Sequence, residues 1–474
     1  MKVRKYFRRL PVLAAALLHV AAGARAQAIH LPPHEKVVLK NGLTLLLLEK
    51  HGVPLVSLTA ILKTGSAADP AGQEGLASVT ADLLRKGTTK RTAQQLATEL
   101  DSIGAAMGTA TDADATNISA EFLTKDLAQG LDLFADALLH PIFPQNEVDK
   151  LLAQDLDGIR GAKDDPQSVL ASYYQGYLFG AHPYGRPEGG HEMSLKRIHR
   201  DAIVKFYEAN FAPGNTILAV AGDFQTAELR KKLEEALGGW PAKPVAPVAI
   251  PVQPPARGRR LLLIDKPDST QVYFAFGNVG IAEKDPDRVA IEVVNSVFGE
   301  RFTSMLNEAL RVESGLTYGV SSTFDSRKAP GPFEIVSFTK NQTTTQAIDM
   351  ALQVLAKLHK DGLTPEQLAS AKSYIKGQFP PSIETSAQLA ARIAYDEFAG
   401  LDDDEVNKLE ARVDAVTPEI ARQVIQKHFP LESVVFVVIG NASAIGPAIE
   451  KYAGKRDARA IGDPGFWPPP AAQK

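Results

Sequence analysis

The chain has no cysteine among its 474 residues. This absence excludes disulfide bridges, a thiolate nucleophile and any zinc or iron–sulfur site held by cysteine. The chain also lacks a large excess of either charge, because 52 Lys and Arg residues nearly balance 55 Asp and Glu residues. A net charge of −3 gives no general attraction to polyanions, so we expect no nucleic-acid partner.

An apolar run near the N-terminus is too short to span a bilayer. Basic residues precede the run 10–22, and either Ala24-Arg25-Ala26 or Ala26-Gln27-Ala28 follows it with small residues at the cleavage positions. About 13 apolar residues fall short of the roughly 20 that a membrane-spanning helix needs, which disfavours the competing interpretation of an uncleaved anchor. The pattern predicts a signal peptide over residues 1–26 and a periplasmic or secreted mature protein without a membrane anchor.

Two segments share the same internal spacing and indicate a repeat. Phe211 precedes Gly222 by 11 residues, Phe429 precedes Gly440 by 11 residues, and the offset between the copies is 218 residues. Each Gly closes a short apolar run that is typical of a buried strand. At 474 residues with 45% hydrophobic composition, the chain suits a soluble globular protein of two to four domains.

Further strands and helices repeat at about the same offset. Segments 42–48 and 55–64 resemble a hairpin, and 260–265 and 271–279 look like its counterpart. Helical patterns cover 75–84, 93–103, 127–139, 146–160, 288–297, 303–312, 344–360 and 365–378. The mixed order predicts an α+β fold of two homologous halves, each an antiparallel-rich sheet covered by helices.

The boundary between the halves is marked by proline. Residues 241–259 carry six prolines, which exclude a helix or a central strand and favour an extended linker. We therefore expect an N-terminal domain at 27–240 and a C-terminal domain at 260–461. Residues 462–474 form a Pro-rich tail that we expect to be disordered or to contact a neighbouring molecule.

A motif follows Gly65 to Pro70 and opens with Gly75-Leu76-Ala77. This frame resembles the active-site segment of the pitrilysin/insulinase zinc metallopeptidases, in which His-x-x-Glu-His supplies two zinc ligands and a general base. In this chain the first His, the Glu and the second His of that motif are replaced by Ser78, Ala81 and Asp82. The resemblance therefore implies a member that has lost its metal ligands, so we expect this chain to bind no metal.

The family's remaining signatures are present. Ala181 to Pro187 is similar to its His-Pro-Tyr-Gly loop, and Leu310 to Val320 is similar to its second-half signature, which places an Arg and a Tyr at Arg311 and Tyr318. The resemblance implies that this pair contacts peptide substrate and stabilises a developing oxyanion. Alternatively, Arg311 caps a helix end and Tyr318 is an ordinary strand aromatic.

The combination resembles the Arg/Tyr-bearing subunits of bacterial heterodimeric members and of mitochondrial processing peptidase. This resemblance implies that the chain forms half of a clamshell and is inactive alone. It would act on a peptide substrate together with a zinc-bearing homologous subunit, and we expect the zinc in that partner. A non-enzymatic peptide-binding or scaffold protein is the main alternative. A third hypothesis is a rewired metal site around Asp82, with help from the acidic helix at 147–160 that would carry the family's third ligand.

Overall fold

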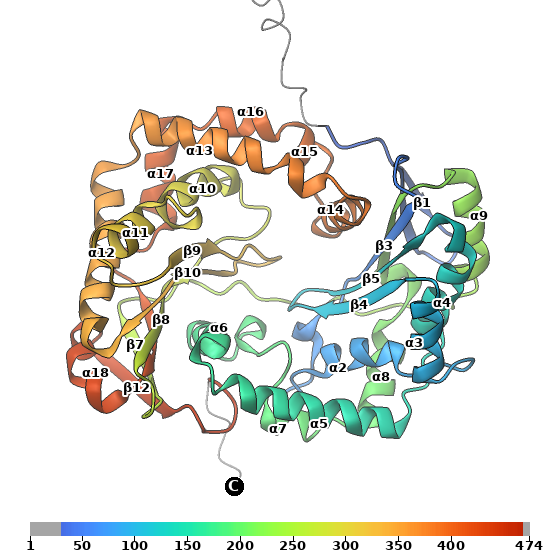
Figure 1. The fold of residues 1–474 in the computed structure, drawn as a ribbon, viewed down its shortest axis with the longest axis horizontal. Helices are drawn as coiled ribbons and strands as arrows, with labels where there is room; N and C mark the ends of the chain where they lie inside the picture. The colour runs from blue at the N-terminus through green and yellow to red at the C-terminus, as the bar shows by residue number, and fades with distance from the viewer. Residues whose placement is uncertain (1–29, 468–474) are drawn as a thin grey trace, which may run out of the picture.

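Two six-stranded sheets organise the computed structural model, which describes residues 30–467 (Figure 1). The predicted signal peptide lies outside the described residues. The first sheet has the order β1-β2-β6-β3-β5-β4 and the second has the order β12-β7-β11-β8-β10-β9. The strands of the first sheet are β1 (Glu35–Val38), β2 (Thr44–Glu49), β3 (Leu55–Leu62), β4 (Ala106–Thr111), β5 (Thr116–Leu123) and β6 (Thr216–Gly222). Those of the second are β7 (Arg260–Asp265), β8 (Gln271–Val279), β9 (Val320–Phe324), β10 (Pro332–Lys340), β11 (Val435–Gly440) and β12 (Lys455–Ala460).

The repeated strands β6 and β11 occupy equivalent central places. All seven residues of β6 and all six of β11 are buried, so each strand needs a neighbour on both sides. Strand β6 pairs parallel to β2 and antiparallel to β3, and β11 does the same between β7 and β8. The predicted hairpins were therefore wrong in pairing, because a strand from much later in the chain inserts between their two arms. The predicted fold class is confirmed, since most neighbouring pairs in each sheet are antiparallel.

Helices cover both sheets. In the first half they are α2 (Leu76–Asp82), α3 (Ala93–Ser102), α4 (Leu127–Leu139), α5 (Gln145–Ala162), α6 (Pro166–Phe179), α7 (Glu192–Leu195), α8 (Arg200–Asn210) and α9 (Thr226–Leu237). In the second half they are α10 (Arg288–Asn295), α11 (Met305–Asn307), α12 (Thr344–Asp361), α13 (Pro365–Gln378), α14 (Ser386–Ala399), α15 (Asp404–Asn407), α16 (Leu409–Asp414), α17 (Pro418–His428) and α18 (Ala442–Ile449). Two π-helical turns, η6 (Ser296–Glu300) and η7 (Glu308–Glu313), continue α10 and α11. Among residues 30–467, no helix combines the length and apolar character needed to cross a membrane.

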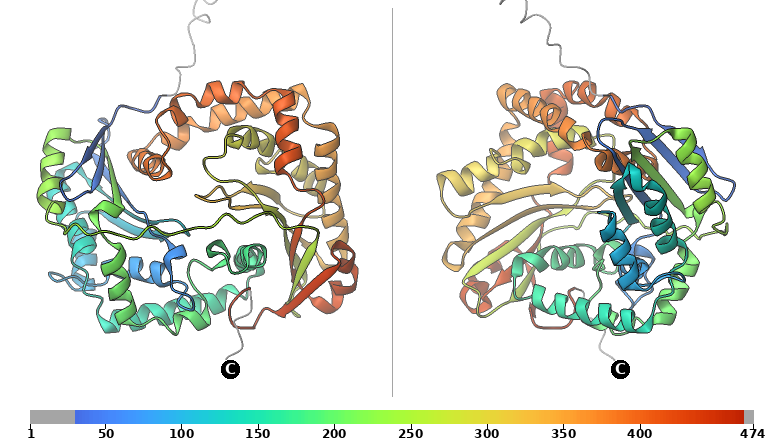
Figure 2. Two further views of the ribbon diagram at one scale, coloured as in Figure 1. Left: turned by 180° about the vertical axis from the view of Figure 1, so that it is seen from behind. Right: turned by 45° about the vertical axis from the view of Figure 1, so that its right-hand side comes forward.

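The two halves exchange one helix each, as Figures 1 and 2 show. Helix α6 belongs to the first half in sequence but packs on the second sheet, where the Tyr174 hydroxyl donates to the Phe333 carbonyl at 2.7 Å. Helix α14 belongs to the second half but packs on the first sheet through Leu389 and Ile393, which are 1% and 2% exposed. Each sheet therefore completes its core with a helix from the other half of the sequence.

Residues 241–258 have no regular secondary structure, in keeping with their proline content. The C-terminal segment differs from the expected disorder as far as it is described, because Phe466 is buried and its ring meets that of Tyr173 edge to face. The Trp467 ring contacts Tyr177 in the same way. Residues 462–467 thus pack against α6, and residues 468–474 lie outside the described part.

Candidate degenerate metal site and paired-residue site

Helix α2 carries the three changed motif positions. Close backbone packing and hydrogen bonds from its first residues fix its N-terminus. Gly75 has a φ of 97°, and a Cβ added there would lie 2.9 Å from the backbone of Gly189. The buried Asp69 carboxylate accepts hydrogen bonds of 2.8 Å from the backbone N–H groups of Gly75 and Ala77. These hydrogen bonds cap the N-terminus of the helix. Burial of the carboxyl group raises the pKa of Asp69 to about 7. The backbone around the N-terminus of α2 is therefore well fixed although the motif's metal ligands are absent from the sequence.

The side chains at the motif positions offer one good ligand. Ser78 is half-buried, Ala81 is 1% exposed, and the Asp82 carboxylate already accepts a 2.5 Å hydrogen bond from the Thr109 hydroxyl of β4. Asp155 of α5 is close enough to Asp82 for the two carboxylates to repel, and burial together with that repulsion raises the pKa of Asp155 to about 6. The structure thus brings α5 beside α2, as the family pattern implies.

These residues do not fit zinc. A protein zinc site needs three or four His, Cys, Asp or Glu ligands, whereas α2 and α5 bring together Asp82 and Asp155 beside a serine and an alanine. Within residues 30–467, the one group of three potential ligands is Asp285, Asp287 and His428 in the second half. That group does not include Asp82, so the rewired-site hypothesis lacks a third ligand in the described structure.

Arg311 lies on the π-helical turn η7, in the second half. Its guanidinium carbon lies 4.3 Å from the centre of the Phe302 ring, and it makes no hydrogen bond or ion pair with any residue between 30 and 467. The carbonyl groups at this helix end are instead bound by the Ser314 hydroxyl, which donates to Ala309 and Leu310 at 2.7 and 3.0 Å. Arg311 therefore forms no hydrogen-bonded cap, and its place in the last turn of η7 leaves an interaction with the helix dipole as the alternative.

Tyr318 is 82% exposed and lies on a loop whose backbone is fixed. The Thr317 hydroxyl accepts from the Gly319 N–H at 3.1 Å, and the Ser337 hydroxyl donates to the Gly319 carbonyl at 2.9 Å. Strand β9 begins at Val320, so Tyr318 precedes the strand and is not one of its residues. Arg311 and Tyr318 are thus both presented from held backbone without polar partners in the described chain.

The His-Pro-Tyr-Gly loop joins the two halves. The Tyr184 hydroxyl donates to the Asp114 carboxylate at 2.9 Å and accepts from the backbone N–H of Ala329 at 3.0 Å. His182 Nε2 lies 2.7 Å from the carbonyl oxygen of Pro251 in the proline-rich segment. Burial raises the pKa of Tyr184, which stays a neutral donor. This loop therefore has a structural role at the junction.

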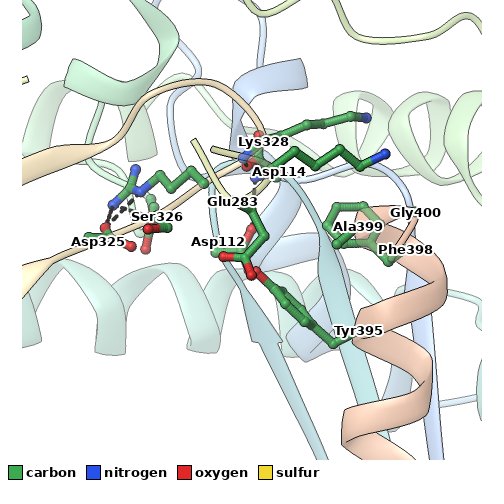
Figure 3. Close-up of a pocket in the computed structure, with 13 residues that line it drawn as sticks. Asp112, Asp114, Glu283, Asp325, Ser326, Lys328, Tyr395, Phe398, Ala399 and Gly400 are labelled. Carbon is green, nitrogen blue, oxygen red and sulfur yellow. Dashed lines mark hydrogen bonds and ion pairs between the residues drawn. The ribbon is translucent and has the colours of Figure 1, made fainter. Parts of the chain in front are cut away.

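A pocket of about 640 Å³ lies beside this junction (Figure 3). Its walls come from five segments, which include Asp112 and Asp114 after β4, the loop 325–328 and the end of α14 at 395–400. Burial raises the pKa values of Glu188 and Glu283 in its wall. No sequence pattern marks this pocket, because its residues are spread from 112 to 400 and share no motif.

The candidate residues fall into two groups in different halves (Figure 1). Ser78, Ala81 and Asp82 lie on α2 beneath the first sheet, whereas Arg311 and Tyr318 lie beside the core of the second sheet. The first group offers one metal ligand, Asp82, which is too few for a zinc site. The second group offers a cationic fork and a phenol, which can donate hydrogen bonds to a carbonyl or an oxyanion of another molecule.

Two family sequence models match successive parts of the chain. Residues 45–187 match the sequence model of the insulinase family, peptidase family M16, and residues 197–375 match that of the peptidase M16 inactive domain. An uncharacterised zinc protease of Streptomyces coelicolor is 27% identical over 79% of this chain and 81% of its own length. One of Bacillus subtilis is 24% identical over 84% of this chain and 97% of its own length.

Two solved structures share the fold. A peptidase M16 inactive domain from Pseudomonas fluorescens has a TM-score of 0.81 and 24% identity, covering 86% of this chain and 98% of its own. A protease from Helicobacter pylori has a TM-score of 0.80 and 20% identity, covering 87% of this chain and all of its own. The arrangement of the two halves is therefore shared with other bacterial proteins.

Proposed function

Because this chain belongs to the insulinase family of peptidases, M16, and lacks the family's zinc ligands, we propose that it is the non-catalytic subunit of a zinc-dependent peptidase. The chain is not a zinc peptidase by itself, since Ser78, Ala81 and Asp82 cannot hold the metal or supply its general base. A zinc-bearing homologous subunit would supply the metal, and this chain would contribute Arg311 and Tyr318 to peptide hydrolysis.

One observation carries the proposal. Arg311 and Tyr318 are held on ordered backbone, yet neither side chain makes a hydrogen bond within residues 30–467. In a shared active site, the guanidinium and the phenol would donate to the scissile carbonyl as negative charge develops on its oxygen. Donors fixed in advance stabilise that charge without the cost of reorganising during the reaction.

The test combines the purified chain with a zinc-bearing M16 subunit from the same organism and measures turnover of a quenched fluorescent peptide. Replacement of Arg311 by Ala should lower turnover by about 10²–10³, the effect of one lost oxyanion donor. Arg422→Ala is the matched control, because Arg422 lies on α17 and its guanidinium already donates to the Asp361 carbonyl. Equal turnover by the Arg311→Ala variant and the unmodified complex would refute the role.

A second candidate function is peptide binding without hydrolysis, which the pocket between the halves favours. Its walls combine carboxylates with the rings of Tyr395 and Phe398, and its volume of about 640 Å³ can hold a few residues of an extended peptide. If no zinc-bearing subunit co-purifies and fluorescein-labelled peptides still bind the isolated chain, this function replaces the first. We also propose that the mature protein acts in the periplasm or outside the cell, on the basis of the signal-like residues 1–26.

A further inference from the structure

The Arg311 side chain lacks the ion pair that its sequence context predicts. Glu308 lies three residues before Arg311, a spacing at which opposite charges pair on an α-helix. No such pair forms here. The segment is a π-helical turn whose hydrogen bonds span five residues, as Ser314 N–H to Ala309 carbonyl shows. The guanidinium lies over the Phe302 ring instead of beside the Glu308 carboxylate.

Phe302 projects from a turn that is anchored on both sides. The Ser304 N–H donates to the Arg301 carbonyl at 3.0 Å and closes the turn. The Arg301 guanidinium donates to the Ser370 hydroxyl at 2.9 Å and lies 5.9 Å from the ring centre of Tyr374, both on α13. Ser304 is fully buried at the start of α11. The backbone on either side of Phe302 is therefore fixed relative to the second half.

The Phe302 ring is 64% exposed, although aromatic rings of this size are usually buried. The guanidinium of Arg311 lies over this exposed ring, with its carbon 4.3 Å from the ring centre. A cation over an aromatic face at an exposed site favours the stacked state by about two- to fivefold. The ring covers one face of the guanidinium and leaves its N–H edge free, because stacking uses none of the donors.

We propose that Phe302 is a positioning residue for Arg311. Its ring keeps the guanidinium away from Glu308 and ready to donate to a peptide carbonyl, so that no ion pair has to break when substrate arrives. This proposal rests on the function proposed above. It also predicts that Phe302 acts through Arg311, so its loss should have no further effect in an Arg311→Ala background.

The first test uses the chain alone and needs no partner. Side-chain Nε–Hε NMR spectra of the ¹⁵N-arginine-labelled protein, with the Arg311 signal assigned from an Arg311→Lys variant, report its ring-current shift and mobility. Phe302→Ala should remove the shift and increase the mobility, and Phe302→Tyr should preserve both. Val312→Ala is the control, since Val312 lies next to Arg311 on η7 and its side chain is 61% exposed. An Arg311 signal that is the same in the Phe302→Ala variant and the unmodified chain would overturn the proposal.

The second test measures peptide turnover in the complex with the zinc-bearing subunit. Phe302→Ala should lower kcat by about two- to fivefold with little change in KM, because the oxyanion contact forms in the transition state. Glu308→Gln added to Phe302→Ala should recover most of the loss, since it removes the competing carboxylate. A loss that Phe302→Tyr fails to rescue would assign Phe302 a merely structural role. If Arg311→Ala itself has no effect on turnover, the proposed function fails, whereas an effect of Arg311→Ala without one of Phe302→Ala refutes only the positioning role.

Discussion

Replacing Ile393 by Ala should destabilise a sheet that lies more than 170 residues earlier in the sequence. Ile393 is 2% exposed on α14, and its cluster includes Leu48, Ile217 and Ala219 of the first sheet. The substitution leaves a cavity between helix and sheet, because neither element can close the gap without moving the rest of its core. The first half should therefore unfold more easily although the change lies in the second half.

The size of the effect follows from burial. Truncating a fully buried Ile to Ala costs about 2–5 kcal/mol, and a helix packed on one face of a sheet falls near the middle of that range. With a urea dependence of about 3 kcal/mol/M, a loss of about 3 kcal/mol lowers the midpoint by about 1 M. Such a shift is several times larger than the error of an ordinary titration.

The assay can report on the first half alone. The chain has two tryptophans, of which Trp240 is buried in the core of the first half and Trp467 contacts α6. In a Trp467→Phe background, urea unfolding followed by fluorescence reports on Trp240. Ile393→Ala should lower the Trp240 midpoint, and Ile420→Ala, at a site that is 37% exposed on α17, should leave it within about 0.2 M.

The refuting result is a Trp240 transition that Ile393→Ala does not move while the second half unfolds earlier. It would mean that the halves are independent units joined by the proline-rich segment. Hydrogen exchange gives a second check, because β3 and β6 should lose protection in the Ile393→Ala variant.

Tyr184→Phe should lower stability by about 1–3 kcal/mol in thermal or urea unfolding, because the buried Asp114 carboxylate and the Ala329 N–H both lose a partner. Burial raises the pKa of Glu334 from 4.5 to about 7, so between these pH values the folded state holds a proton that the unfolded chain has released, and stability falls as pH rises. Glu334→Gln should flatten that fall in urea midpoints measured from pH 4.5 to 7, and an unchanged slope would show that another group causes it. Neither EDTA nor added zinc should shift the melting temperature, because a metal that bound the folded protein would raise that temperature. An increase at stoichiometric zinc would contradict the conclusion that the motif residues do not bind zinc.

Much of the local structure could be predicted from the sequence. The helices at 127–139 and 365–378 match α4 and α13, and the strands at 260–265 and 271–279 match β7 and β8. These segments have clear periodicity and end at strong signals such as Pro365. Strand pairing could not be predicted in the same way, since the pattern shows that β6 and β11 are buried without showing which strands flank them.

The exchange of α6 and α14 also lay beyond the sequence. The apolar stripe of α14 predicts one buried face, but hydrophobic burial has no direction that identifies the covering sheet. For the candidate site, the changed motif and the Arg/Tyr pair could be located from local signatures. The contact of Arg311 with Phe302 could not, because Phe302 lies in the turn after η6, outside any helical periodicity that would pair it with Arg311 on η7.

The exchanged helices also bear on how the chain folds during synthesis. Strand β6 ends at Gly222, and the helix that covers it begins at Ser386, so about 160 residues must be added before the first sheet can complete its core. At about 5–20 residues per second, one apolar face of that sheet stays uncovered for roughly 8–30 s. The protein should therefore depend on chaperones that shield this face until translation is nearly finished, and a ribosome that stalls before codon 386 would release an aggregation-prone intermediate.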